Sequence, residues 1–443
     1  MSLLPTNWVQ APIGSLCDLK NGRAFKPAEW SQDGLPIVRI QNLNNGSAPF
    51  NRFNGAYDNR HYLKGGELLF AWSGTPGTSF GAHVWLGGKA LLNQHIFRVD
   101  FDDALLDRRF FRHAINQKLT ELIGVAHGGA GLQHVTKGVF EGTEVALPPR
   151  LEQKRIADTL DTVLTRVDTV NTRLARVAPI LKRFRQSVLA AATSGQLTAD
   201  WRATHGINAG VETTLQTICM PDRVITYGVV KLGDDTPGGT PCLRTSNVRW
   251  LRFELDGMKL IHPRLSAEYQ RTVLRGGEVL VNVRGTLGGV AVATDDMTGW
   301  NVSREVAVVP IDQALADPAY ISFWIASDEC QRWLTGVAKG VAYTGINIED
   351  LRTLPLKLPS KDEQAEIVRR VETLFAFADR IDARVQDVQM ATERLTPAFM
   401  AKAFSGQLVP QDPNDEPASK LLRRLQQEAP SISTKKRGRK TAI

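Results

Sequence analysis

The chain contains an internal tandem repeat, which constrains its fold more than any other sequence feature. A Pro-x-x-x-Glu-Gln segment at 148–153 returns at 359–364, and Ser-Gly-Gln-Leu at 194–197 returns at 405–408, both shifted by 211. Two earlier landmarks keep the same order, 64–69 with 275–280 and 35–42 with 240–247. The last pair is shifted by 205, a drift that loop insertions explain. Four ordered landmarks at nearly one spacing indicate a tandem duplication.

Each copy ends in a long helix with heptad spacing. Apolar residues recur at alternating steps of four and three from Ile156 to Val188. The same positions shifted by 211 run from Ile367 to Phe399, and only Thr392 among them is polar. This pattern is the a/d seam of a coiled coil.

Local signals mark the ends of these helices. Gly195 and Gly406 follow the last apolar positions and predict left-handed helix stops. Ser360 with Glu363 predicts a capping box. Pro179 should kink the first helix, because it removes a backbone hydrogen bond.

A single apolar seam has to be buried, and we expect the two helices to pair with each other. An antiparallel pair is favoured, because a folded lobe separates the helices in the chain and duplicated units tend to pack about a two-fold axis. The alternative, in which each helix covers its own lobe, stays open.

The segment before each helix predicts a mixed lobe of short strands, bounded by Gly, Asn and Asp turn residues. One helix per lobe, near 110–122 and 320–334, carries aromatic residues at core spacing. The predicted fold is α+β: two tandem β-rich lobes, each followed by a long helix, with the helices forming an antiparallel coiled coil of pseudo-two-fold symmetry. The predicted boundaries are 1–150, 151–197, 198–360, 361–408 and a disordered basic tail at 409–443.

The charge is unevenly distributed. Residues 411–443 carry eight Lys or Arg and four acids, which is +4 of the net +8. A short helix is expected at 418–428, and the basic hexamer at 435–440 either touches phosphates or is simply solvated. The mildly basic remainder permits a polyanionic partner without requiring one.

The sequence lacks the usual motifs of catalysis. It has no phosphate-binding loop, no dinucleotide fingerprint and no Asn-Pro-Pro-Tyr or Asn-Pro-Pro-Phe segment. His127 and His134 flank a glycine-rich stretch without a third metal ligand. Four well-separated cysteines and the lack of a long apolar run favour a reducing, cytoplasmic location without membrane spans. The chain is therefore interpreted as a binder.

Two dissimilar lobes, each followed by a heptad helix between these landmarks, resemble the DNA-specificity subunit of a type I restriction–modification system. The resemblance covers residues 1 to about 410. It implies that each lobe is a target recognition domain for half of a bipartite, asymmetric site in double-stranded DNA. It further implies that the helices dock two modification subunits, which methylate DNA with S-adenosylmethionine. Restriction subunits would add translocation and cleavage that need ATP and Mg²⁺. This chain itself would be non-catalytic and hold no cofactor.

Candidate DNA-binding residues follow the shared landmarks, at loop positions where the lobes mostly differ. Arg, Asn, Gln and Glu side chains suit base reading in the major groove, although a turn or phosphate-positioning role is open for each. Arg39 and Arg244 are common to both lobes and are assigned to backbone contact or structure. The full set is Arg39, Gln41, Asn42, Ser73, Gln94, His95, Gln133 and His134 in the first lobe, and Arg244, Ser246, Asn247, Arg284, Arg304 and Asn347 in the second.

Two alternatives remain at the sequence level. One is a self-contained DNA methyltransferase or nuclease with an unrecognised site, which transfer of methyl groups by the isolated chain would reveal. The other is a coiled-coil scaffold without DNA function, which two divergent lobes with polar loops disfavour.

Overall fold

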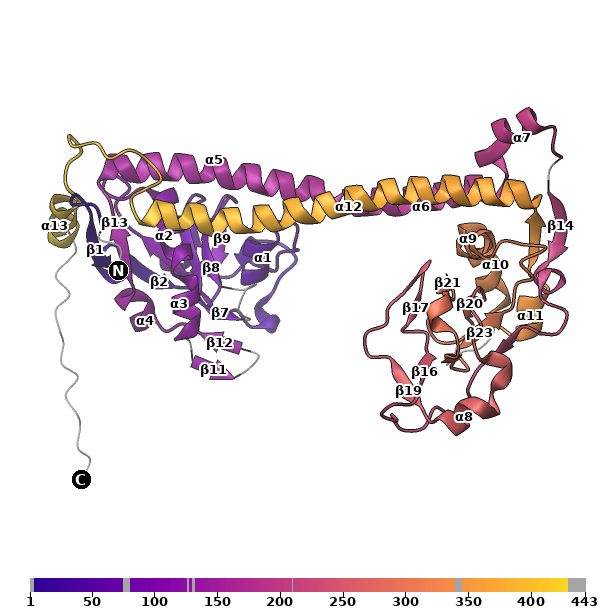
Figure 1. Ribbon diagram of the computed structural model, residues 1–443. Coiled ribbons are helices and arrows are strands. Elements are labelled where there is room, and N and C mark those ends of the chain that lie inside the picture. The colour runs from indigo at the N-terminus through magenta and orange to yellow at the C-terminus, as the bar shows by residue number, and fades with distance from the viewer. Residues whose placement is uncertain are drawn as a thin grey trace, which may run out of the picture. The chain divides into compact units, whose positions relative to one another are not determined.

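The computed structural model describes residues 4–74, 80–125, 127–129, 132–208, 210–338 and 345–428. These residues belong to two compact units (Figure 1). Unit 1 is Met1–Thr172 with Gln389–Ile443, and unit 2 is Arg173–Val388. Each unit therefore combines the lobe of one copy with the adjoining part of its own long helix and a stretch of the other copy's helix. No helix among the described residues is long and apolar enough to cross a membrane.

The lobe of unit 1 is built on small sheets. An antiparallel sheet has the order β2-β10-β6-β8, formed by Asp18–Asn21, Ile96–Asp100, Leu68–Ala71 and Gly81–Val84. A second sheet has the order β4-β3-β9-β5, formed by Arg52–Phe53, Leu35–Val38, Ala90–Leu92 and Tyr62–Leu63. A third has the order β11-β12-β7, formed by His127–Gly129, Leu132–His134 and Ser73–Gly74. Strand β1 (Val9–Pro12) pairs with β13 (Glu144–Leu147), so the beginning of the lobe is tied to its end.

Helices close the core of this lobe. They are α1 (Ile40–Asn44), α2 (Arg108–Gln117), α3 (Leu119–Gly124), α4 (Lys137–Gly142) and α5 (Arg150–Ala175). Phe110 and Phe111 of α2 are at most 1% exposed, which confirms that the aromatic residues of this helix belong to the core.

The lobe of unit 2 repeats this architecture. Its main sheet has the corresponding order β15-β23-β20-β21, formed by Thr226–Tyr227, Val306–Val309, Val279–Asn282 and Val290–Val292. Around it lie β14 (Val211–Thr214) paired with β24 (Pro355–Leu358), the sheet β19-β16-β22 (Lys259–Ile261, Thr240–Leu243, Asn301–Val302), and the hairpin β17-β18 (Val248–Arg249, Arg252–Phe253). The parallel pairing of β3 with β9 recurs as β16 with β22, which confirms two lobes of one fold.

The helices of unit 2 follow the same plan. They are α6 (Val177–Thr193), α7 (Ala199–His205), α8 (Pro263–Glu268), α9 (Pro318–Ala326), α10 (Asp328–Val337) and α11 (Ile348–Arg352). The long helix α12 (Lys361–Phe404) begins in unit 2, and its last stretch belongs to unit 1.

The glutamine of the Pro-x-x-x-Glu-Gln landmark fastens each long helix to its lobe. Gln153 is fully buried, and its amide accepts a hydrogen bond from Asp107 N (2.8 Å) and donates one to Pro148 O (2.9 Å). Gln364 does the same with Asp317 N (2.7 Å) and Pro359 O (2.9 Å). Because Asp107 and Asp317 are the N-caps of α2 and α9, one side chain locks the helix of the lobe to the start of the long helix.

The glutamate of the same landmark shows how the long helices pair. In unit 1, Glu152 near the start of α5 accepts hydrogen bonds from Trp8 and from Gln411, which follows the end of α12. In unit 2, Glu363 near the start of α12 accepts from Thr198 and Arg202, which follow the end of α6. The start of one helix thus meets the end of the other in both units, so the antiparallel pairing is confirmed.

The seam is buried where lobe and helices meet. Ile156 and Leu160 share a core with Phe399 and Ala403 in unit 1, and Val188 shares one with Ile367 and Val371 in unit 2. Near the middle of each series, Val170 and Val388 are 37% and 44% exposed. The seam is therefore incompletely covered at these two positions.

The structure shows how the long helices break and end. The first helix is interrupted at Arg176, one turn before Pro179, as expected for a proline that cannot donate a backbone hydrogen bond. Gly195 and Gly406 have φ of +76° and +74°, which confirms both stops. The capping box is only half formed: Glu363 N donates to Ser360 Oγ (3.3 Å), but the Glu363 carboxylate binds Thr198 and Arg202 instead of returning to Ser360.

The expectation of a disordered tail from residue 409 is wrong for residues 409–428. The expected helix α13 (Ala418–Glu428) forms, and Ala418, Leu421 and Leu425 pack into the core of the first lobe. Ala418 N donates to Asn7 O (3.0 Å), and the buried Asp415 forms an ion pair with Arg155 (2.6 Å). The apolar face of α13 is what draws this polar segment onto the lobe. The basic hexamer at 435–440 lies outside the described residues.

Candidate nucleic-acid interface

Three candidates of the first lobe line one concavity. Arg39, Gln94 and His95 border a hollow of about 260 Å³ together with Trp30. The Arg39 guanidinium lies 5.7 Å from the centre of the Trp30 ring, and that ring is 40% exposed. A cation held over an aromatic face keeps its outward donors free for an anion or a base edge.

An aromatic cluster adjoins this hollow. The Trp72 ring centre lies 5.2 Å from that of His95 and 5.9 Å from that of His134. Nδ1 of both histidines and Nε1 of Trp72 are buried and have no hydrogen-bond partner among the described residues. Burial and the neighbouring His134 lower the pKa of His95, so its imidazole is neutral at pH 7. Such unsatisfied polar atoms are rare in folded proteins and point to a ligand or ordered water.

Two other candidates in this part of the lobe have different settings. Ser73 is only 3% exposed and lies opposite His134 where β7 pairs with β12. Gln133 is the next residue along β12, and its side chain lies outside the described part of the structure.

The two candidate asparagines hold turns together. Asn42 is 4% exposed: its Oδ1 accepts from Arg39 N (3.0 Å), and its Nδ2 donates to Ala48 O and Pro49 O. Asn247 is 1% exposed and repeats the arrangement with Arg244 N (3.0 Å) and Glu254 O (2.9 Å). Both amides are engaged by backbone, so in this conformation they organise the loop instead of presenting themselves to a base. The adjacent Gln41 and Ser246 are exposed.

Two exposed candidates of the second lobe are cationic, Arg284 and Arg304. The Arg284 guanidinium lies 5.6 Å from the centre of the Tyr227 ring, and Arg284 N donates to Glu305 O (3.3 Å) beside Arg304. Both arginine side chains are exposed, and neither has an ion-pair partner among the residues that the structure describes. Their full charge is therefore available to an anionic partner.

The remaining candidates of this lobe divide between structure and surface. Arg244 donates to Gly257 O (2.7 Å), which supports a structural role for this shared arginine. Asn347 is exposed at the N-cap of α11 and makes no side-chain capping bond. The backbone N–H of Ile346, the residue before Asn347, donates to Val283 O (2.8 Å). Asn347 therefore lies close to Arg284, the residue that follows Val283.

Sequence reasoning missed the aromatic partners of these side chains. Trp30, Trp72 and Tyr227 each lie against a candidate arginine or histidine. A sequence signal for these residues was available. An aromatic residue lies close to a landmark in one copy, while the other copy has a residue of another type at the equivalent position, as with Trp72 and Val283.

Among the described residues, no group of three or more His, Cys, Asp or Glu could hold a metal ion. Burial raises the pKa of Cys219, Cys242 and Cys330 to about 12, so these thiols are poor nucleophiles at neutral pH.

Sequence comparison gives consistent matches. The family model described as the type I restriction modification DNA specificity domain matches residues 5–178 and 238–387. The specificity subunit of the type I restriction enzyme EcoBI from Escherichia coli is 31% identical, over 98% of this chain and 95% of the relative. The EcoKI specificity subunit from Escherichia coli strain K12 is 28% identical, over 99% and 98%.

Solved structures show the same fold. A chain from a study of complex assembly and conformational transition of the type I R-M system superposes with a TM-score of 0.66 at 17% identity, covering 92% of this chain and all of that one. The HsdS subunit from Thermoanaerobacter tengcongensis gives a TM-score of 0.57 at 18% identity, covering 91% and 98%.

Proposed function

The chain belongs to the family of type I restriction–modification DNA specificity subunits, and from this premise we propose that its two lobes read the two halves of a bipartite, asymmetric DNA site. One observation carries the proposal. The lobes share their sheet order and their buried turn asparagines, yet they differ in the side chains at the ends of equivalent strands. Two lobes with a common scaffold and different side chains at the strand ends are suited to reading two different half-sites.

The side chains at the strand ends favour different binding chemistry in the two lobes. Arg284 and Arg304 are exposed guanidinium groups that can grip guanine O6 and N7 or phosphate. In the first lobe, Arg39 over Trp30 and the His95–Trp72–His134 cluster offer one cation and the neutral imidazole of His95. We expect the second lobe to contribute more of the salt-dependent binding.

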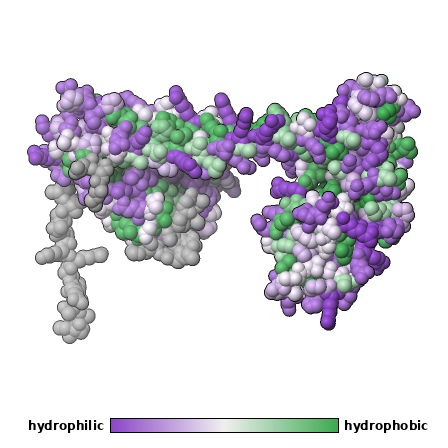
Figure 2. Space-filling model, in the orientation of Figure 1, coloured by the Kyte–Doolittle hydropathy of each residue, from purple (hydrophilic) through white to green (hydrophobic). Residues whose placement is uncertain are grey.

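The paired helices are proposed to dock the modification subunits. Several apolar side chains on them are exposed to solvent, and hydrophobic patches are visible along the helices in Figure 2. In unit 1 these are Leu151 (62% exposed), Met390 (50%) and Leu395 (40%), and in unit 2 Ile180 (52%) and Phe377 (53%). Exposed apolar patches of this kind mark protein interfaces.

We assign no catalysis to this chain. Methylation with S-adenosylmethionine, and translocation and cleavage with ATP and Mg²⁺, are proposed to reside in the modification and restriction subunits. Incubation of the isolated chain with DNA and S-adenosylmethionine should transfer no methyl group.

A binding experiment with half-site variants tests the proposal. Arg284→Ala and Arg304→Ala, singly and together, are assembled with the modification subunits and titrated with DNAs in which one half-site is scrambled. Each lost base contact should cost about 1–3 kcal/mol of binding free energy, or about 5- to 150-fold in affinity. This loss should appear on DNAs that keep the half-site of the second lobe and should be absent on DNAs in which that half-site is scrambled. Arg332→Ala on α10 is the control, since it removes another exposed guanidinium of the same lobe. Equal losses at both half-sites, or none, would contradict the assignment.

A further inference from the structure

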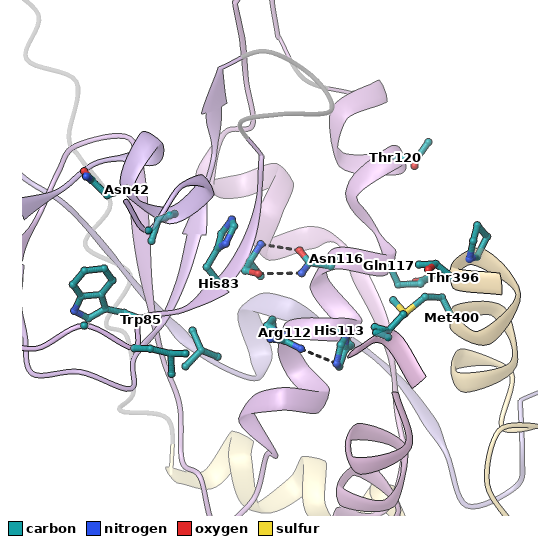
Figure 3. Close-up of a pocket in the computed structure, with 18 of the residues that line it drawn as sticks. Asn42, His83, Trp85, Arg112, His113, Asn116, Gln117, Thr120, Thr396 and Met400 are labelled. Carbon is teal, nitrogen blue, oxygen red and sulfur yellow. Dashed lines mark hydrogen bonds between the residues drawn. The ribbon is translucent and has the colours of Figure 1, made fainter. Parts of the chain in front are cut away.

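Unit 1 contains a pocket of about 1100 Å³ between its lobe and its helices (Figure 3). The lobe contributes α1, β8 and the end of α2, while α5 and the last turns of α12 supply Leu164, Pro397 and Met400. Phe50, Trp85 and Leu43 add apolar wall, and Leu86 beside them is 88% exposed. The pocket reaches the size of small-molecule and side-chain receptor sites.

The corresponding place in unit 2 is filled by the chain's own aromatic residues. Phe375 of α12 lies 5.8 Å from Trp250 and 6.1 Å from Phe323 of α9, measured between ring centres. The Trp250 indole donates to Ala326 O at the end of α9 (3.1 Å). These three rings join the turn of the β17–β18 hairpin, the lobe helix α9 and the long helix α12 into one core.

The repeat shows what the first copy has in their place. Phe375 corresponds to Leu164 at the shift of 211, and Trp250 to Asn45 at the shift of 205. Phe323 corresponds to His113 at a shift of 210, which also relates the N-caps Asp317 and Asp107. His113 turns to Asp161 (2.8 Å), and Asn116, the counterpart of Ala326, pairs with the backbone of Ala82 (2.7 and 3.0 Å). Three aromatic rings are thus replaced by smaller or polar side chains, and the space that they would fill is the pocket.

The pocket also offers one uncommitted polar atom. Nε2 of His83, on β8, is buried and has no hydrogen-bond partner among the described residues. Figure 3 shows the His83 ring beside Asn116 at the pocket, where a ligand's N–H group or acceptor could meet it. Aromatic walls, an exposed leucine and one polar contact are suited to an amphipathic aromatic ring such as indole.

We propose that this pocket receives a large aromatic side chain, tryptophan in the first instance, from a modification subunit docked on the α5–α12 pair of unit 1. The partner's ring would take the place that Trp250 and Phe375 fill in unit 2. The inference rests on the proposed function for the identity of the partner, but the pocket itself rests on the comparison of the two copies. Because only one copy has the space, the two modification subunits would dock inequivalently.

Indole is the probe for the pocket. Saturation-transfer NMR with the full chain should show transfer to indole, and Gly46→Trp should abolish it by placing an indole of its own at the pocket. A Cβ at Gly46 meets nothing within 4 Å, so a side chain can leave the backbone there without a clash. Gly138→Trp on α4, equally open but away from the pocket, is the matched control and should retain transfer. Thr120→Trp, from another wall, serves if Gly46→Trp fails to fold.

Native mass spectrometry with the modification subunit tests the partner. The natural chain and Gly138→Trp should bind two subunits, while Gly46→Trp should bind the second at least tenfold more weakly and leave a 1:1 complex. No transfer to indole in the natural chain would overturn the pocket. Transfer with unchanged 2:1 assembly of Gly46→Trp would overturn the partner, and displacement of indole by DNA alone would assign the pocket to a nucleobase. If the natural chain binds no modification subunit, the proposed function fails while the indole result still stands.

Discussion

The buried glutamine at the start of each long helix permits a quantitative test. Gln153→Met keeps the volume of the side chain but removes its amide. Asp107 N–H and Pro148 C=O, now bonded at 2.8 and 2.9 Å, would both lose their partner in a site with no solvent exposure. Each buried, unpaired group costs about 1–3 kcal/mol, so the free energy of unfolding should fall by about 2–6 kcal/mol.

Urea unfolding followed by far-UV circular dichroism measures this loss. With an m-value of about 2 kcal/mol/M, a loss of about 3 kcal/mol lowers the midpoint by about 1.5 M. Gln364→Met removes the equivalent bonds in unit 2 and should cost a similar amount, and the two effects should add because the sites are in different units. Gln117→Met, on the exposed side of α2, is the control for the substitution itself.

Two results would refute the reasoning. A Gln153→Met variant within about 0.5 kcal/mol of the natural chain would show that the paired hydrogen bonds do not fasten helix to lobe, since surface substitutions vary by that much. A large cost at one glutamine and none at the other would show that the repeated landmark does not have one structural role.

Three further predictions concern other parts of the chain. Leu421 is 1% exposed, so Leu421→Ala should weaken the packing of α13 on the lobe by about 2–5 kcal/mol. The amides of α13 should then exchange hydrogen faster, and unchanged exchange would contradict the packing of α13 on the lobe. Burial is the largest cause that lowers the pKa of four histidines of unit 1 below 6.5, so the unfolded state binds more protons than the folded state near this pH. The free energy of unfolding should therefore fall as the pH drops through about 6.5, and His83→Gln should reduce this fall. A urea midpoint that does not change between about pH 7.5 and about pH 5.5 would contradict this prediction. These histidines are His61, His83, His95 and His113. One heptad inserted after Leu174 and one after Val385 should add about 10.5 Å to each helix, which equals about three base pairs at about 3.4 Å each. The preferred DNA spacer should then lengthen by about three base pairs, while both half-sites stay the same. An unchanged spacer would show that the helices do not set the spacer length.

The sequence alone established the elements of this protein and their repetition. Heptad steps from Ile156 and from Ile367 identified the long helices, and short apolar runs bounded by turn residues located the strands near residues 68–71 and 279–282. Gly195 and Gly406 marked helix ends because only a residue without a side chain adopts their positive φ easily. Such signals are local: periodicity and turn chemistry act within a few residues, so they can be read without a fold.

Only the tertiary structure decided what each buried face meets. Asn42 and Asn247 suited base reading by residue type, yet both turn inward to hold their own loops. Residues 409–428 have the composition of a tail, yet Leu421 completes the core of a lobe that begins more than 400 residues earlier in the chain. Sequence periodicity shows that a face must be buried, but the partner that buries it is set by packing between residues distant in the chain. The same reason explains why one copy encloses its aromatic rings and the other leaves a pocket.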